Sequence, residues 1–122
     1  MTIKTLLIVD DSTTARLLIQ AMLKELHPEW NYLQAANAEE ALEILQKSPV
    51  DYFSIDYNMP NVTGLELIHT IRQNHPNNRI VLLTANIQPQ VDIKAKQLDC
   101  LCLNKPLTDS VIKQAAEHFT HE

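Results

Sequence analysis

Five short apolar runs alternate along this chain with five segments that have the apolar spacing of amphipathic helices, and this alternation constrains the fold most strongly. The runs have the length and the β-branched and leucine content of buried strands. They span residues 5–9, 30–35, 50–55, 79–83 and 100–103. Because the runs are apolar without clean alternation, helices should cover both faces of a parallel sheet. We therefore predict an α/β fold, a doubly wound five-stranded parallel sheet with five helices.

Capping residues and apolar stripes define the helices between these runs. Ser12 or Asp11 can cap the first helix, Asn37 and Glu40 form a capping arrangement for the second, and Thr108 can cap the last. The predicted buried face of the first helix consists of Ala15, Leu18, Ile19, Met22, Leu23 and Leu26. The predicted inner positions of the fourth helix are Ile87, Val91, Ala95 and Leu98.

Length and composition limit the classes of protein to consider. A chain of 122 residues, with 45% apolar and 20% charged residues, is most simply one globular domain over residues 1–122. A net charge of -5 argues against direct nucleic-acid binding. There is no run of about 18 apolar residues and no signal-peptide pattern, so we expect a cytoplasmic protein without membrane insertion. We also expect a monomer, with dimerisation through the face of the fourth helix as the alternative. Cys100 and Cys102 are expected to be reduced thiols in or beside the core.

Polar residues follow four of the predicted strands at the point where each strand ends. They are Asp10 and Asp11, Asp56, Thr84 and Lys105. Because the carboxyl ends of parallel strands lie at one edge of the sheet, we expect these side chains to face one cleft. Taken singly, Asp11 could be a helix cap, Thr84 a strand residue and Lys105 a solvated charge. Their joint position favours a functional site.

The charge of this cluster predicts a metal. Three carboxylates within about 5 Å of one another repel by roughly 3 kcal/mol per pair at an effective dielectric near 20. We expect Lys105 and a hard divalent cation, Mg²⁺, to offset this charge, with Asp10 and Asp11 holding the metal. The histidines, at positions 27, 69, 75, 118 and 121, are scattered, so a zinc site is not supported. A single glycine argues against the glycine-rich phosphate loops of nucleotide-binding proteins.

An aspartate carboxylate can itself attack phosphorus and form an aspartyl phosphate. Asp56 is the predicted acceptor, because it ends the central apolar run and lies among the other acids. Lys105 is predicted to pair with one phosphoryl oxygen, and Thr84 to donate a hydrogen bond to another.

The spacing of Asp10-Asp11, Asp56 to Pro60, Gly64, Thr84-Ala85 and Lys105-Pro106 resembles the response-regulator receiver domain of two-component signalling. The likeness is strongest to stand-alone, chemotaxis-type regulators, and it covers essentially the whole chain. It implies a flavodoxin-like sheet of order 2-1-3-4-5 and a cis peptide bond between Lys105 and Pro106.

The resemblance also implies roles for individual residues. Mg²⁺ would be held by Asp11, Asp56 and the backbone carbonyl of Asn58, with Asp10 acting through water. Asp56 would take a phosphoryl group from the phosphohistidine of a histidine kinase or a phosphotransfer protein. Asn58 and Asn86 would flank the attacking water and tune the lifetime of the phosphoryl group.

Phosphorylation would then change a surface formed by the fourth helix, the fifth strand and the fifth helix, which binds a downstream protein. We expect this phosphorelay protein to have no output domain of its own. The predicted surface includes Gln90, Lys94, Cys102 and Lys113.

Three features depart from the family pattern. Cys102 occupies the switch position, where receiver domains usually have an aromatic residue. Residues 97–99 stand where glycine and alanine usually close the fourth helix, and the interval from Thr84 to Lys105 is one residue shorter than in the chemotaxis pattern.

Two other functions remain as alternatives. A magnesium-dependent phosphohydrolase would also use an aspartyl-phosphate intermediate, although such enzymes often have two acids separated by one residue, whereas Asp10 and Asp11 are adjacent. A pseudo-receiver would bind partners without phosphorylation. We expect the protein not to be an enzyme, apart from slow autodephosphorylation.

Overall fold

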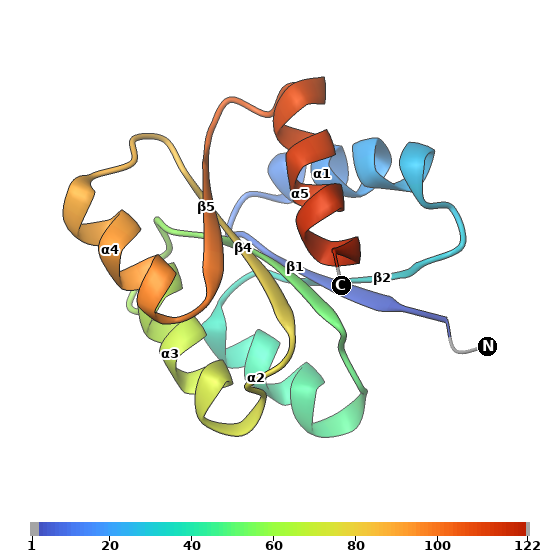
Figure 1. The fold of residues 1–122 in the computed structure, drawn as a ribbon. Coiled ribbons are helices and arrows are strands. Elements are labelled where there is room, and N and C mark those ends of the chain that lie inside the picture. The colour runs from blue at the N-terminus through green and yellow to red at the C-terminus, as the bar shows by residue number, and fades with distance from the viewer. Residues whose placement is uncertain (1–2, 122) are drawn as a thin grey trace.

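The computed structural model describes residues 3–121, which form five strands and five helices in strict alternation (Figure 1). The strands are β1 (Thr5–Val9), β2 (Asn31–Ala35), β3 (Tyr52–Asp56), β4 (Arg79–Thr84) and β5 (Cys100–Asn104). The helices are α1 (Thr13–Leu26), α2 (Ala38–Lys47), α3 (Gly64–Asn74), α4 (Pro89–Gln97) and α5 (Asp109–Thr120). The predicted elements are therefore all present, with strand boundaries displaced by one or two residues.

The five strands form one parallel sheet in the order β2-β1-β3-β4-β5. Helices α1 and α5 cover one face, and α2, α3 and α4 cover the other (Figure 1). The predicted doubly wound architecture and the strand order implied by the family resemblance are confirmed.

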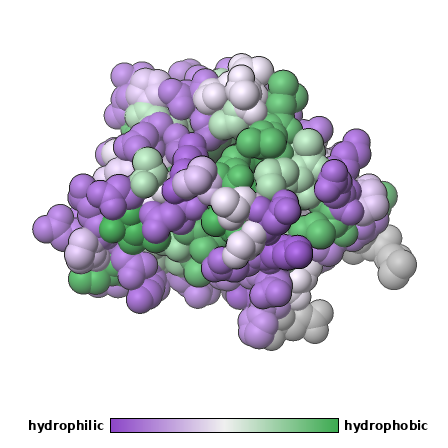
Figure 2. Space-filling model, turned by 90° about the horizontal axis from the view of Figure 1, so that it is seen from above, coloured by the Kyte–Doolittle hydropathy of each residue, from purple (hydrophilic) through white to green (hydrophobic). Residues whose placement is uncertain are grey.

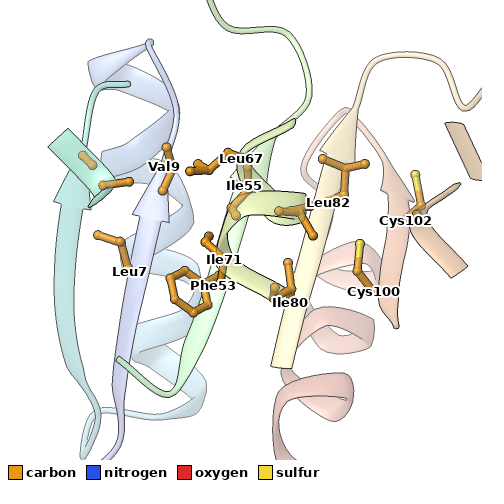
Figure 3. Close-up of a cluster of buried hydrophobic side chains, with 14 of the residues drawn as sticks. Leu7, Val9, Phe53, Ile55, Leu67, Ile71, Ile80, Leu82, Cys100 and Cys102 are labelled. Atoms are coloured by element: carbon orange, nitrogen blue, oxygen red, sulfur yellow. The ribbon is translucent and has the colours of Figure 1, made fainter. Parts of the chain in front are cut away.

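Two apolar cores flank the sheet, because successive residues of a strand point to opposite faces. Leu6 and Ile8 of β1 pack toward α1 and α5, whereas Leu7 and Val9 pack toward the other three helices. Figure 3 shows the second core, in which the labelled side chains are Leu7, Val9, Phe53, Ile55, Leu67, Ile71, Ile80, Leu82, Cys100 and Cys102. Burial of each large aliphatic side chain contributes roughly 1.5–3 kcal/mol, so these layers fix the strands whose ends carry the polar residues.

Side-chain caps begin four of the five helices. Ser12, Asn37, Thr63 and Thr108 each accept a hydrogen bond from a backbone N–H of the first turn. Asp11 is therefore not the cap of α1. Helix α4 differs, because its N-cap Gln88 makes no side-chain capping bond.

The predicted buried face of α1 is partly wrong. Ile19 and Leu23 are buried, but Leu18 and Leu26 are 46% and 41% exposed. The neighbouring Leu17 is 57% exposed as well. The sheet and α5 cover only a narrow stripe of this helix, so the remaining leucines lie at the surface.

On the face shown in Figure 2, hydrophilic side chains predominate and hydrophobic ones gather between them. Within residues 3–121, none of the helices has the length and apolar character needed to cross a membrane.

Candidate functional site

The polar residues predicted from the strand ends do lie at one edge of the sheet. Asp56 and Thr84 are the last residues of β3 and β4, Asp10 follows β1, and Lys105 follows β5. Since all five strands are parallel, their carboxyl ends meet at this edge.

Three carboxylates form the centre of the site. Each of Asp10, Asp11 and Asp56 offers an oxygen within 4.8 Å of the others, and no other group of this kind occurs within residues 3–121. Asp10 and Asp56 are 1% and 5% exposed, whereas Asp11 is exposed to solvent. At an effective dielectric near 20, charges at this separation repel by roughly 3 kcal/mol per pair. The fold therefore holds together acids that would separate in water.

Lys105 reaches into the acidic cluster. Its Nζ lies 3.0 Å from Asp56 Oδ1 and 3.3 Å from Asp10 Oδ2. Burial raises the pKa of Asp56 and outweighs the hydrogen bond from Lys105, which acts to lower it. Burial acts to lower the pKa of Lys105, but the hydrogen bond and charge of Asp56 outweigh it, so this pKa is raised. With three carboxylates and one ammonium the site has an excess of negative charge, which suits a divalent cation.

The donor set fits a hard cation such as Mg²⁺, because it consists of carboxylate oxygens. Protein groups engage both oxygens of Asp10: the backbone N–H of Ser12 donates to Oδ1 at 2.9 Å, and Lys105 lies near Oδ2. Asp11 and Asp56 are thus the acids with more capacity left for a metal.

The turn after β3 is held close to the site by backbone hydrogen bonds. Tyr57 N–H donates to the Leu83 carbonyl at 2.8 Å, and Gly64 N–H donates to the Tyr57 carbonyl at 2.9 Å. A Cβ on Gly64 would lie 2.5 Å from the backbone oxygen of Asp56, so only glycine allows α3 to begin this close to Asp56. Asn58 lies in this turn and is exposed.

Thr84 is buried, and its hydroxyl is turned toward the β4–α4 loop, residues 85–88. Thr84 Oγ1 donates to the Asn86 carbonyl at 3.3 Å and lies 3.4 Å from the Asn86 N–H. The side chain of Asn86 is in an exposed segment directly beyond the site. The threonine hydroxyl is therefore engaged locally while Lys105 occupies the space beside Asp56.

Cys102 lies in the core and is only 9% exposed, so the prediction that it belongs to the partner-binding surface is wrong. The prediction of reduced cysteines agrees with the structure, in which Cys100 and Cys102 are unpaired thiols. Burial raises the pKa of Cys100 to about 12 and also raises that of Cys102, which keeps both protonated. Gln90, Lys94 and Lys113, by contrast, are exposed on α4 and α5.

Three polar side chains near the site or α4 were not predicted from the sequence. Arg16 of α1 donates to the backbone carbonyl of Asp10 at 2.6 Å. Asn104 accepts from the Ile87 N–H, and Arg72 donates to the Leu98 carbonyl. Each of these contacts joins a side chain to a backbone group that comes near it only in the folded chain. No spacing of residue types in the sequence indicates such a contact.

The sequence of this chain matches a known family. The family model described as the response regulator receiver domain matches residues 6–117. The chain belongs to this receiver family. Receiver domains are generally phosphoryl acceptors, not classical enzymes, and they take phosphoryl groups from histidine kinases.

Similar receiver sequences occur in proteins of very different length. The chain is 38% identical over 111 residues to the sensor protein EvgS of Escherichia coli O157:H7, covering 88% of this chain but 9% of EvgS. It is 30% identical over 115 residues to the chemotaxis protein CheY of Pseudomonas aeruginosa, covering 92% of both. The chain thus spans less than a tenth of EvgS and nearly all of CheY.

A solved receiver structure confirms the fold. Response regulator TrrA from Thermotoga maritima, crystallised in complex with Mg²⁺ and BeF, superimposes with a TM-score of 0.82 at 28% identity. The match covers 95% of this chain and 99% of TrrA.

Proposed function

We propose that this receiver domain is a phosphorylation-activated switch in which Asp56 accepts a phosphoryl group in a Mg²⁺-dependent reaction. The observation that carries the proposal is the surroundings of Asp56, a buried carboxylate 3.0 Å from Lys105 and in one cluster with Asp10 and Asp11. The TrrA structure supports it, since it is a complex with Mg²⁺ and BeF, and BeF mimics a phosphoryl group.

Asp11, Asp56 and the backbone carbonyl of Asn58 would hold the metal, and Asp10 would act through water. The cation supplies positive charge for the phosphoryl oxygens and for the acids. Ser12 and Lys105 occupy the oxygens of Asp10, which is consistent with its indirect role.

In the transfer, a carboxylate oxygen of Asp56 forms a bond to phosphorus as the bond from phosphorus to the donor's histidine nitrogen breaks. The electron pair of the broken bond stays on the imidazole, which takes up a proton. Lys105 moves its hydrogen bond from Asp56 to a phosphoryl oxygen, and Thr84 donates to another. Water later hydrolyses the acyl phosphate slowly, at a rate tuned by Asn58 and Asn86.

Signalling follows from a shift between two conformations of α4, β5 and α5, whose exposed face binds a downstream protein. The exposed residues of this face include Gln90, Lys94 and Lys113. The phosphoryl donor is a histidine kinase or a histidine phosphotransfer protein.

The test treats wild-type protein and Asp56→Asn protein with a small-molecule phosphodonor, with and without Mg²⁺, and measures intact mass. The proposal predicts the gain of one phosphoryl group in the wild type with Mg²⁺ and none in the variant. An equal gain in both proteins would contradict the acceptor assignment. Sustained hydrolysis of a small phosphoester would instead favour the phosphohydrolase alternative.

A further inference from the structure

The two ends of α4 are held in different ways. At its N-terminal end the helix begins with Gln88 and Pro89 and has no side-chain capping bond, unlike the other four helices in residues 3–121. This end depends on contacts from outside the helix, because the first N–H groups of a helix have no partner within it.

One such contact comes from β5, the strand that Lys105 follows. Asn104, the last residue of β5, accepts a hydrogen bond at its Oδ1 from the Ile87 N–H at 3.1 Å. The next residue is Lys105, whose own N–H donates to the Thr84 carbonyl at 2.8 Å. The Asn104 side chain therefore links the lysine end of the site directly to the β4–α4 loop.

The same loop has a second contact with the site. Thr84 Oγ1 bonds to the backbone of Asn86, one residue before Ile87. A threonine hydroxyl that turns toward a phosphoryl group on Asp56 must give up these bonds. The β4–α4 loop is then held next to α4 by the hydrogen bond from the Ile87 N–H to the Asn104 side chain, which is uncharged and lies at the surface.

The opposite end of α4 is fastened more firmly. The guanidinium of Arg72, on α3, donates to the carbonyls of Leu98 at 2.6 Å, Asp99 at 2.9 Å and His75 at 3.1 Å. Asp99 has a φ of 55°, the left-handed conformation that usually falls to a glycine after a helix. Hydrogen bonds from a charged donor are roughly twice as strong as neutral ones, so this end resists displacement better than the Asn104 end.

We propose that Asn104 is a latch that couples the phosphorylation site to α4. Movement of Thr84 and Lys105 toward a phosphoryl group releases the Ile87 N–H from Asn104, and α4 then moves at its N-terminal end about the end held by Arg72. The coupling needs no aromatic residue at position 102. It displaces the exposed side chains of Gln90 and Ile93 on α4. This inference rests on the proposed function.

The latch is tested first in the unmodified protein, by NMR measurement of amide solvent exchange. Asn104→Leu removes the acceptor at similar size, whereas Asn104→Asp keeps an acceptor oxygen and is the matched control. Exchange of the Ile87 amide should accelerate about three- to tenfold in the leucine variant and change little in the aspartate variant. The Tyr57 amide, bonded to Leu83 in the sheet, should stay protected in both and reports intact folding. Equal Ile87 exchange in the leucine variant and the wild type would overturn the latch.

The second arm measures the phosphorylated wild type, with uptake verified by mass. The Ile87 amide should lose its protection on phosphorylation, while the Leu98 amide at the Arg72 end should keep its own. If the protein takes up a phosphoryl group but the exchange of the Ile87 amide is unchanged, the latch is overturned. An equal acceleration of exchange at the Leu98 amide also overturns it. Neither result affects the acceptor role of Asp56. Failure of uptake overturns the proposed function and the coupling with it, whatever the first arm shows.

Discussion

At the scale of single residues, Asp56 is placed where its charge is unfavourable in the metal-free protein. Burial raises its pKa and is the largest cause; repulsion by Asp10 and Asp11 acts in the same direction, while the hydrogen bond and charge of Lys105 act to lower it. A folded-state pKa above the unfolded value means that the ionised carboxylate lowers stability, and this loss appears as the pH rises through the folded pKa. The site is therefore arranged for binding at some expense of stability.

Replacement of Asp56 by asparagine should stabilise the metal-free protein at pH 7. The free energy of unfolding should rise by about 1 kcal/mol, or about 3–6 °C in Tm, because one of three clustered charges is removed. Thermal unfolding in the presence of a chelator measures this change. Saturating Mg²⁺ should raise the Tm of the wild type more than that of the variant.

Asp109→Asn, at the exposed start of α5, is the matched control and should change stability by less than about 0.5 kcal/mol. A metal-free Asp56→Asn protein less stable than the wild type would show that the acid is held favourably, against this account.

His118 gives a second residue-scale prediction, concerning pH. Its Nε2 is buried and has no hydrogen-bond partner among residues 3–121, and burial, followed by the charge of Arg79, lowers its pKa. The unfolded chain then binds more protons than the folded one as pH falls below the ordinary histidine value of 6.5, so stability should fall in this range. The slope contributed by one histidine is at most about 1.4 kcal/mol per pH unit.

Denaturant unfolding of wild-type and His118→Gln proteins between about pH 7.5 and 5 measures this slope, which the variant should lose. His69→Gln serves as the control, because His69 lies at the exposed surface of α3, far from His118 along the chain, and the slope due to His118 should persist in it. Parallel curves for the wild type and His118→Gln would contradict the prediction.

At the scale of secondary-structure elements, the start of α3 and the end of β3 are packed backbone to backbone. The space at Gly64 is closed on three sides, since an added Cβ would lie 2.5 Å from the Asp56 oxygen, 2.8 Å from Leu82 Cδ1 and 2.9 Å from Tyr57 Cα. The position of α3 thus sets the position of the Asp56 backbone.

Gly64→Ala should destabilise the protein by about 1–3 kcal/mol, because either α3 or the Asp56 peptide must shift. This loss should appear even though alanine favours helix by about 1 kcal/mol over glycine. Equilibrium unfolding measures it, and a Mg²⁺ titration should show weaker binding. Ser110→Ala, in the exposed first turn of α5, is the control and should change stability by less than about 0.5 kcal/mol. A Gly64→Ala protein as stable as the wild type would refute the close packing.

At the scale of the whole molecule, three features could be predicted from the sequence: the parallel sheet, the alternation of strands with helices, and the edge of the sheet where the polar residues meet. These features follow from local apolar periodicity and from the shared direction of parallel strands. The exposure of Leu18 was not predictable, because a helical stripe does not show how much of it the neighbouring elements cover. The contacts of Arg72 and Asn104 depend on where distant backbone groups come together in the folded chain, for which no sequence period exists.

Chemical mapping of the modified residue tests whether Asp56 carries the phosphoryl group. Protein treated with a phosphodonor and Mg²⁺ is reduced with borohydride, which converts an aspartyl phosphate to homoserine, and is then sequenced by tandem mass spectrometry. The account predicts homoserine at position 56, dependent on Mg²⁺. A phosphoryl group that resists borohydride, or that maps to a histidine or a hydroxyl residue such as Ser54, would contradict it.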